Sequence, residues 1–459
     1  MGIENTKVNV DSLPNAPKQI YKTLSAPVTA QWELTDWCNQ RCFHCYNYWR
    51  NDNPETVEPS DSVGQIHHTI AREIVANHVF SVTITGGEPL PFIKKYAESI
   101  GLLRDADVDL KVNSNLTLFD REYGHILKDL GITSLLTSVI SYNPNTHDRL
   151  CCSPGSHKKI SDNIRRALDM GFRVSPNMVV SKLNLGDIEG TAKYVKSLGL
   201  TSFLATKATA PPNCPDFSQY SLSLEELKIM FNLLKKAEAE YGVSVDSLEP
   251  YPMCHFQDHD QLKAFGQRVC GAGKSICTIG FDGAVRPCSH ADQVSGIISD
   301  QNSFKELWLK LRPWRTDEYL PEECSKCSIR NVCYGGCRVE ACVVNGDLKS
   351  RNPYCDPENI PNINSLELTW KNDDVKFNPG SAFQFNPHLK YRGEEFGGIL
   401  FLSPKAWVGV NEYILTFYKK RKDSPFVVKD LSDDIGVERG SLVETMHLLY
   451  KKNIIEERR

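Results

Sequence analysis

Long apolar runs are the most conspicuous absence in this sequence. No stretch of the 459 residues approaches the roughly 18 consecutive apolar residues of a membrane-spanning helix. Residues 1–17 are polar and lack the basic-then-apolar pattern of an export signal. From these two absences we expect a cytoplasmic protein with no membrane partner.

An excess of positive charge is also lacking. The 53 lysines and arginines are balanced by 57 aspartates and glutamates, so the formal net charge is -4. Such a chain offers no broad attraction to nucleic acid or to an anionic membrane, and we expect no nucleic-acid partner. At 459 residues the chain is too long for one ordinary domain, and roughly two to four domains are expected.

Cysteine, by contrast, is plentiful, with 16 residues. A secreted disulfide scaffold would be small and would carry an export signal, so metal or cluster binding is the better explanation. Three cysteines lie between residues 38 and 45, and nine lie between 270 and 355. The other four are scattered and are interpreted as buried apolar side chains: Cys151, Cys152, Cys214 and Cys254.

The N-terminal cysteines, Cys38, Cys42 and Cys45, have the spacing C-x3-C-x2-C. They follow a largely apolar run, Val28–Leu34, that is typical of a strand. Cysteine thiolates hold iron–sulfur cubes, and a complete cage needs four of them. Three thiolates would leave one iron open, which indicates a reactive centre rather than a sealed electron store.

This spacing and its setting resemble the radical S-adenosylmethionine (SAM) superfamily. The resemblance implies a 4Fe-4S cluster held by Cys38, Cys42 and Cys45, with SAM bound to the open iron. It also implies cleavage of SAM to a 5′-deoxyadenosyl radical that abstracts a hydrogen atom, so that the cofactor carries the difficult chemistry and the protein directs it. His44 stands where the family usually has Tyr, Phe or Trp near the adenine, and is a candidate cofactor contact.

The segment Gly86-Gly87-Glu88-Pro89 follows a β-branched run at 80–85. Alone it would indicate a strand-to-helix turn, because two glycines allow a close backbone approach and proline fixes the exit. It resembles the family's GGEP segment, whose backbone contacts the SAM amino group. All four residues are therefore candidate cofactor contacts.

Two further segments resemble SAM-binding parts of the family. Asn113–Thr117 is similar to the turn near the SAM ribose, with Leu116 in place of a glycine; Ser114 and Asn115 are candidate cofactor contacts or turn caps. Ser141 opens a segment that resembles another family motif and is a further candidate. His147, in the same segment, is interpreted as structural.

Strands and helices alternate between residues 28 and 207, which indicates βαβ crossovers and a parallel sheet. A doubly wound sheet fits this alternation equally well. The resemblance implies a partial (β/α)6 TIM-like barrel, in which chemistry lies at the C-terminal ends of the strands. The predicted strands are 28–34, 80–85, 109–113, 134–140, 173–180 and 202–207, and the predicted helices are 59–77, 93–105, 120–130, 158–171 and 185–198.

The second group of cysteines resembles the SPASM extension of radical SAM enzymes, a loop-rich domain that holds auxiliary clusters. The resemblance implies two auxiliary 4Fe-4S clusters, three clusters in all. One would be held by Cys270, Cys277, Cys288 and Cys337, and the other by Cys324, Cys327, Cys333 and Cys355. A zinc site made by Cys324, Cys327, Cys333 and Cys337 is the alternative, and Cys342 could substitute for a cluster ligand.

The C-terminal residues predict a small α+β, winged-helix-like domain, with a strand or β-hairpin element at 396–401 and helices at 411–418, 428–435 and 441–453. It resembles the recognition element of enzymes that modify ribosomally synthesised peptides, which binds a leader peptide as an added strand. A DNA reader should be basic. Residues 383–459 carry 13 basic and 11 acidic side chains, which favours a peptide over DNA.

Together these patterns predict six segments and lead to one main hypothesis. The segments are an N-terminal arm (1–27), the partial barrel (28–215), a helical connector (216–265), the SPASM domain (266–358), a linker (359–382) and the winged-helix domain (383–459). The hypothesis is a radical SAM peptide maturase, an oxidoreductase that installs a thioether, carbon–carbon or related crosslink in a precursor peptide. It would need an external electron donor of the flavodoxin or ferredoxin type.

Two alternatives remain open. One is an enzyme that oxidises Cys or Ser in a protein, as in anaerobic sulfatase maturation. The other is an iron–sulfur redox sensor that binds DNA through the winged helix.

Overall fold

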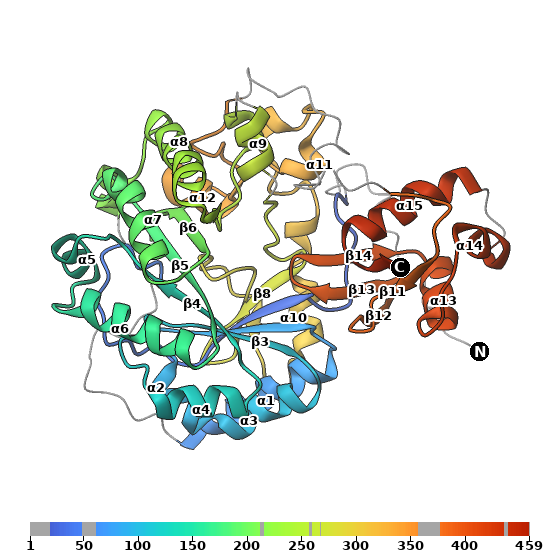
Figure 1. The fold of residues 1–459 in the computed structure, drawn as a ribbon, viewed down its shortest axis with the longest axis horizontal. Helices are drawn as coiled ribbons and strands as arrows, with labels where there is room; N and C mark the ends of the chain where they lie inside the picture. The colour runs from blue at the N-terminus through green and yellow to red at the C-terminus, as the bar shows by residue number, and fades with distance from the viewer. Residues whose placement is uncertain are drawn as a thin grey trace, which may run out of the picture.

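A computed structural model describes residues 19–47, 61–211, 215–256, 259–266, 268–356, 377–435 and 439–458. Figure 1 shows a curved sheet with helices on its outer side, a loop-rich segment above it, and a smaller C-terminal module beside it. In the described part of the chain no helix is long and apolar enough to cross a membrane.

The central sheet has ten strands in the order β10-β9-β8-β1-β2-β3-β4-β5-β6-β7. Strands β1 to β8 are parallel to one another, whereas β9 pairs antiparallel with β8 and β10 antiparallel with β9 at one edge. The seven strands from β1 to β7 follow one another in chain order without a reversal. A doubly wound sheet reverses its order at a switch point, so the predicted partial barrel is confirmed and the doubly wound alternative is wrong.

The barrel strands are short and mostly buried, as expected for a parallel sheet covered by helices. Their bounds are β1 Thr29–Glu33, β2 Ser81–Thr85, β3 Asp109–Asn113, β4 Ser134–Ser138, β5 Arg173–Val180, β6 Ser202–Lys207 and β7 Ser244–Asp246. The helices between them are α1 Asp61–Ala76, α2 Leu90–Lys95, α3 Ala97–Asp105, α4 Arg121–Asp129, α5 Pro144–Cys151, α6 Ser156–Asp169 and α7 Ile188–Ser197. The helix predicted at 93–105 is two helices, which meet at Tyr96.

The sheet continues beyond the last strand that the sequence predicted. Helix α8, Leu224–Tyr241, begins with the capping box of Ser223 and Glu226 and is followed by β7, which pairs in parallel with β6. A short turn, Met253–His255, and helix α9, His259–Phe265, complete this stretch. Residues 216–265 therefore contribute a strand to the barrel as well as helices.

The cysteine-rich segment begins as part of the same sheet, because β8 pairs with β1. Its strands are β8 Ile276–Ile279, β9 Ala284–Arg286 and β10 Gly296–Ile297, and its helices are α10 Phe304–Lys310, α11 Arg330–Cys333 and α12 Arg338–Asn345. A buried ion pair between Arg286 and Glu33 joins β9 to β1. This segment is thus fixed to the barrel by backbone pairing and by charge.

The C-terminal module contains three antiparallel strands in the order β12-β13-β14, a separate pair β11-β15, and three helices. The strands are β11 Phe383–Phe385, β12 Lys390–Glu394, β13 Gly397–Ser403, β14 Ala406–Val410 and β15 Ile455–Glu457, and the helices are α13 Glu412–Arg421, α14 Val428–Ile435 and α15 Arg439–Lys451. The sequence predicted the three helices and one of these strands.

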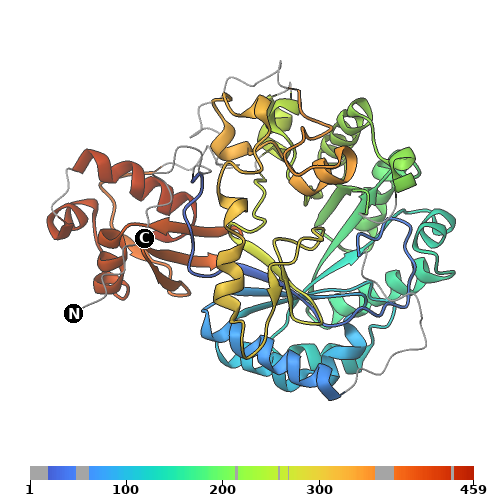
Figure 2. The ribbon, with the colours of Figure 1, turned by 180° about the vertical axis from the view of Figure 1, so that it is seen from behind.

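One face of the three-stranded sheet packs against the barrel. Phe401 of β13 stacks on Phe80 with ring centroids 4.8 Å apart, and it belongs to the barrel core. Arg392 of β12 donates hydrogen bonds to the backbone oxygens of Ala26, Pro27 and His78, at 2.6, 3.0 and 3.0 Å. Figure 2 shows residues 19–27 running between the barrel and the module. The contacts of Phe401 and Arg392 hold the module against the barrel.

Candidate functional site

The three cysteines of the C-x3-C-x2-C triplet lie on the loop that follows β1. Cys38, Cys42 and Cys45 all line one cavity of about 410 Å³ at the C-terminal ends of the barrel strands. The loop is held by hydrogen bonds from Arg41 to the backbone oxygens of Cys38 and Gln40, at 2.6 and 3.0 Å. The structure therefore brings together the three thiols that the spacing predicted.

Two glycines allow the turn after β2 to lie against this loop. A Cβ at Gly87 would be 1.9 Å from the backbone oxygen of Trp37, and a Cβ at Gly86, which has a φ of +136°, would be 2.6 Å from the backbone oxygen of Thr35. The backbone N–H groups of Gly87 and Glu88 donate to the oxygens of Thr35 and Trp37, at 2.8 and 2.7 Å. Any side chain at Gly86 or Gly87 would displace the cysteine loop, and both glycines line the cavity.

Glu88 connects the turn after β2 to the turn after β3. Its side chain is fully buried and accepts hydrogen bonds from Ser114 Oγ at 2.7 Å, Asn115 N at 2.8 Å and Leu90 N at 3.1 Å. Burial raises the pKa of Glu88 to about 7, although these three donors lower it. Glu88 does not line the cavity, and neither does Pro89, which precedes α2; both residues position the turns that do.

The turn after β3 places Ser114 and Asn115 at the cavity wall. Asn115 Nδ2 donates to Asn39 Oδ1 at 2.8 Å, so this turn also holds the cysteine loop. Leu116, which stands where the resembling motif has glycine, has a φ of +54°. Its backbone therefore adopts the left-handed conformation that glycine would favour, and Asn163 holds it by donating to its oxygen at 2.7 Å.

Of the other sequence-predicted contacts, His44 lines the cavity and Ser141 does not. Ser141 is fully buried, donates to Asp187 Oδ2 at 2.6 Å and accepts from Asn143 N at 2.9 Å. His147 is also buried, and its Nδ1 accepts from Ile140 N at 3.2 Å. Ser141 and His147 thus fix the backbone around α5 rather than facing the cavity.

The opposite wall carries charged residues that sequence reasoning missed. Lys207 at the end of β6 forms an ion pair with Glu249 at 2.9 Å and a second one with Glu340, and it is 1% exposed. Burial alone would lower the pKa of Lys207, but the two carboxylates raise it well above its usual value. His290 lies beside this pair, with Nε2 4.0 Å from Glu249 Oε1. The only available signal was the position of Lys207 at a strand end.

Three cysteines of the second group line the same cavity as the triplet. These residues, Cys270, Cys288 and Cys337, are called the inner trio below. Cys277 is not with them: it is 1% exposed on β8 and packs in the barrel core. Side chains alternate along a strand, and Ile276 points into the cavity, so Cys277 points to the other face.

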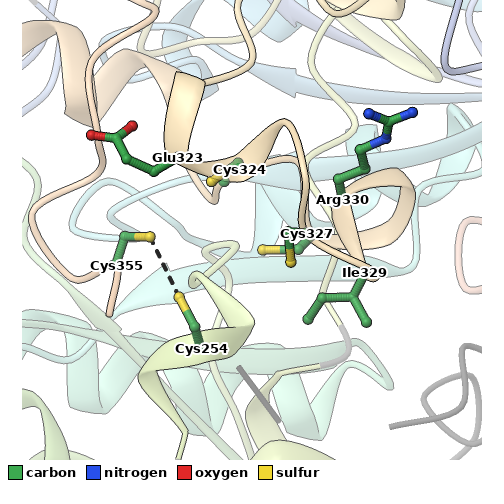
Figure 3. Close-up of a pocket in the computed structure, with 9 residues that line it drawn as sticks. Cys254, Glu323, Cys324, Cys327, Ile329, Arg330 and Cys355 are labelled. Atoms are coloured by element: carbon green, nitrogen blue, oxygen red, sulfur yellow. Dashed lines mark hydrogen bonds between the residues drawn. The ribbon is translucent and has the colours of Figure 1, made fainter. Parts of the chain in front are cut away.

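Five other cysteines surround a second, smaller cavity (Figure 3). They are Cys254, Cys324, Cys327, Cys333 and Cys355, called the outer quintet below. Four of them are the ligand set that the resemblance implied. The fifth, Cys254, was interpreted from the sequence as a scattered apolar side chain, yet its sulfur lies 3.4 Å from that of Cys355.

A buried lysine lies close to both groups of cysteines. Lys274 is 6% exposed, and its ammonium group has no hydrogen-bond partner within the described ranges. It lies over the rings of Tyr21 and Tyr334, 4.3 and 4.0 Å from their centroids. Burial lowers its pKa to about 8, and the sulfurs of Cys270 and Cys333 oppose that shift. A buried cation without a partner is costly, so this position fits a neighbouring anionic cluster.

The chemistry of the thiols fits iron–sulfur clusters as well. Burial raises the pKa of Cys38 and of Cys288 to about 12 in each case, and neighbouring thiols add to the effect. Grouped thiolates need cations beside them, and iron provides these cations. The fifteen described cysteines are all thiols rather than disulfides. In the same ranges no three potential ligands converge closely enough for a single metal ion.

Comparison with known families agrees with this geometry. Residues 32–195 match the model of the Radical SAM superfamily. This range contains the cysteine triplet, the glycine turn after β2 and the turn after β3. Residues 32–195 are therefore a radical SAM domain, and this family implies SAM and a 4Fe-4S cluster as cofactors.

Two relatives and one solved structure illustrate the similarity. An AdoMet-dependent heme synthase of Methanosarcina barkeri is 26% identical over 72% of this chain and 97% of its own length. A PqqA peptide cyclase of Rhodopseudomonas palustris is 21% identical over 73% of this chain and 88% of its own length. Streptococcus suis SuiB, solved with its precursor peptide SuiA, has a TM-score of 0.53 and is 15% identical over 72% of this chain and 75% of SuiB.

Proposed function

We propose that this chain, a member of the radical SAM superfamily, abstracts a hydrogen atom from a ribosomally made precursor peptide and thereby installs a crosslink. The crosslink would be a thioether, a carbon–carbon bond or a related oxidative modification. One observation carries the proposal: a single cavity connects the cysteine triplet with the inner trio. A substrate group in that cavity lies between the reactive centre and a second thiol site that can take up an electron.

The triplet end of the cavity would bind the cofactors. Cys38, Cys42 and Cys45 would hold the reactive cluster, and the two glycines after β2, which have no side chains, would let SAM approach the backbone closely. When bound, reduced cluster and SAM supply a carbon radical that can remove a hydrogen atom from a substrate. Ser114, Asn115 and His44 would contact SAM, while Glu88 and Pro89 position the turns after β2 and β3. Ser141 would support α5 instead.

The opposite end would hold the substrate. Lys207 and Glu249 present a buried ammonium and a carboxylate to the cavity, and these groups can bind the amide groups of a peptide. Two auxiliary clusters would complete the electron path, one at the inner trio and one at the outer quintet. Cys270, Cys288 and Cys337 would hold the first, and the second would use Cys324, Cys327, Cys333 and Cys355. A flavodoxin- or ferredoxin-type donor would reduce the enzyme.

The C-terminal module supports a peptide substrate. Strand β14 is an edge of the module's sheet, whereas β12 carries Arg392 and Lys390, which attach this sheet to the barrel. A leader peptide can add to a free strand edge through main-chain hydrogen bonds. In Figure 1, β14 is the strand of the module's sheet that lies nearest to α15. A leader bound there would be tethered to the barrel that modifies the core peptide.

Haem synthesis is the second candidate, because an AdoMet-dependent heme synthase is among the relatives described above. That enzyme aligns over nearly its whole length, yet more than a quarter of this chain remains outside the alignment. A C-terminal module docked on the barrel is not needed to bind a porphyrin. We therefore favour the peptide, and the experiment below includes both substrates.

The test uses the full-length chain, reconstituted anaerobically with iron and sulfide and reduced with dithionite. With SAM, the wild type should release 5′-deoxyadenosine. The Cys38→Ala variant should release about 100-fold less, because one iron of the reactive cluster loses its ligand. Equal release by both proteins would contradict the assignment of the triplet.

The same preparation distinguishes the substrates. The probe is a fluorescently labelled synthetic peptide with the sequence of a short peptide encoded beside the gene. It should bind the full-length chain, and its mass should decrease on turnover because the crosslink removes hydrogen atoms. Conversion of an added iron porphyrin, with the peptide unbound, would favour haem synthesis. Binding to duplex DNA alone, without nucleoside release, would favour a redox sensor.

A further inference from the structure

We propose that Cys254 is an alternative ligand of the outer auxiliary cluster and that either Cys254 or Cys355 can bind its fourth iron. The inference rests on the proposed function, because it assumes a cluster at the outer quintet. It goes beyond the ligand set that the SPASM resemblance implied, which does not contain Cys254.

Cys254 comes from outside the cysteine-rich segment. It lies on the short turn Met253–His255, which follows β7 in the chain, and it packs in one cluster with Cys324 and Cys355. Its side chain is 7% exposed. Figure 3 shows its sulfur pointing at Cys355 across the cavity edge, and the two sulfur atoms are 3.4 Å apart. An iron atom that Cys355 can bind is therefore also within reach of Cys254.

The surroundings of Cys254 suit a ligand rather than an apolar filler. The backbone N–H of Asp356 donates to Cys254 Sγ at 3.2 Å. The N–H of Met253 donates to Cys333 Sγ at 3.3 Å, so the turn that carries Cys254 already supports one sulfur of the set. Hydrogen bonds of this kind stabilise a thiolate. An apolar side chain would leave the N–H of Asp356 without this acceptor.

Stoichiometry then requires a choice. A cube takes four thiolates, and the outer quintet supplies five. The sulfur atoms of Cys254 and Cys355 lie 3.4 Å apart, so they compete for one corner. Exchange between them breaks one iron–sulfur bond and forms another; the departing thiolate keeps its electron pair, and no electron is transferred. The cluster can therefore persist when either ligand is lost.

The test compares iron and acid-labile sulfide in the full-length, anaerobically reconstituted chain. Cys254→Ala and Cys355→Ala should each keep the wild-type iron content, whereas the Cys254→Ala/Cys355→Ala double variant should lose at least about one iron per chain, because its three remaining thiolates leave the fourth corner without a ligand. The matched control is Cys355→Ala/Cys342→Ala, which also removes two cysteines, and it should keep its iron. Electron paramagnetic resonance of the reduced proteins should show a changed outer-cluster signal in Cys355→Ala, because a different thiolate binds.

Several results would overturn the proposal. Cys355→Ala or Cys254→Ala alone could lose as much iron as the double variant, or the double variant could keep all of it. Loss of iron in the control would assign the alternative ligand to Cys342 instead. An unchanged circular dichroism spectrum and unchanged SAM binding would show that the double variant is folded. A wild type that lacks the outer cluster altogether would instead contradict the proposed function.

Discussion

The inner trio and the outer quintet are built from the same residue type but differ in number and setting. The inner trio has three thiols, and they face the cavity that also contains the triplet. The outer quintet has five thiols around its own cavity, away from that of the triplet. Among the described cysteines, none adds a fourth thiol to the inner trio, because Cys277 lies on the opposite face of β8.

This difference teaches what each site is suited for. A cluster with three cysteine ligands leaves one iron available to another ligand, and at the inner trio that ligand would come from the substrate cavity or from its polar wall. A cluster with more thiols than it needs has no open corner. The inner site is therefore suited to a direct exchange with the substrate, and the outer site to storing an electron.

The largest expected effect comes from the same substitution made at both sites. Cys337→Ala leaves two thiols at the inner trio and should remove that cluster, a loss of about four irons per chain. Cys355→Ala leaves four thiols at the outer quintet, with Cys254 beside the vacated corner, and should keep the iron content of the wild type. Iron and sulfide analysis of both variants, reconstituted in parallel, checks this.

Equal losses of iron from the two variants would contradict the difference in thiol number between the inner trio and the outer quintet. If Cys337→Ala keeps its iron, a fourth ligand from outside the trio must hold the inner cluster. SAM binding to each variant serves as the control, because the triplet is untouched by either change.

The sequence predicted the barrel well where the signal is local. Strands β3 and β5 have the predicted bounds because local apolar patterns mark them: Leu110 and Val112 alternate with polar residues in β3, and β5 ends with the apolar residues 178–180. Strand β7 was missed because it has three residues, Ser244–Asp246, which is too short for periodicity; its pairing with β6 maintains it. The triplet and the glycine turn were likewise recognised because their chemistry lies in consecutive residues.

The sites that depend on distant residues could not be predicted in the same way. Cys254 meets Cys355 across 101 positions of sequence, so no spacing motif connects them. Cys277 was included because eight thiols make two sets of four, but a count does not reveal which face of a strand a side chain occupies. Lys207 gains its partners Glu249 and Glu340 only when three separate segments pack together.

A smaller effect is expected from the lysine that both sites share. Lys274→Met removes a buried positive charge near Cys270 and Cys333, so both auxiliary reduction potentials should fall. A unit charge at roughly 8 Å, in an effective dielectric of about 20, contributes about 2 kcal/mol, which is a shift on the order of 80 mV for one electron. Redox titration followed by electron paramagnetic resonance measures this shift.

The matched control for that experiment is Lys326→Met. Lys326 lies between Cys324 and Cys327 in the sequence but is exposed, so solvent and salt screen its charge. Its removal should leave both potentials nearly unchanged. If the two variants behave alike, or if Lys274→Met shifts only one site, Lys274 does not link the inner trio to the outer quintet.

The smallest effect is expected at Cys277, and it tests the number of thiols at the inner trio. Cys277→Ala should keep the wild-type iron content, because the side chain points away from the cavity. It should lower stability by about 1 kcal/mol, since it removes a small buried group from the barrel core. A thermal midpoint lowered by a few degrees, with unchanged iron, would support the count of three. Loss of iron in Cys277→Ala would make Cys277 the fourth ligand, and the inner cluster would then have no open corner for a substrate.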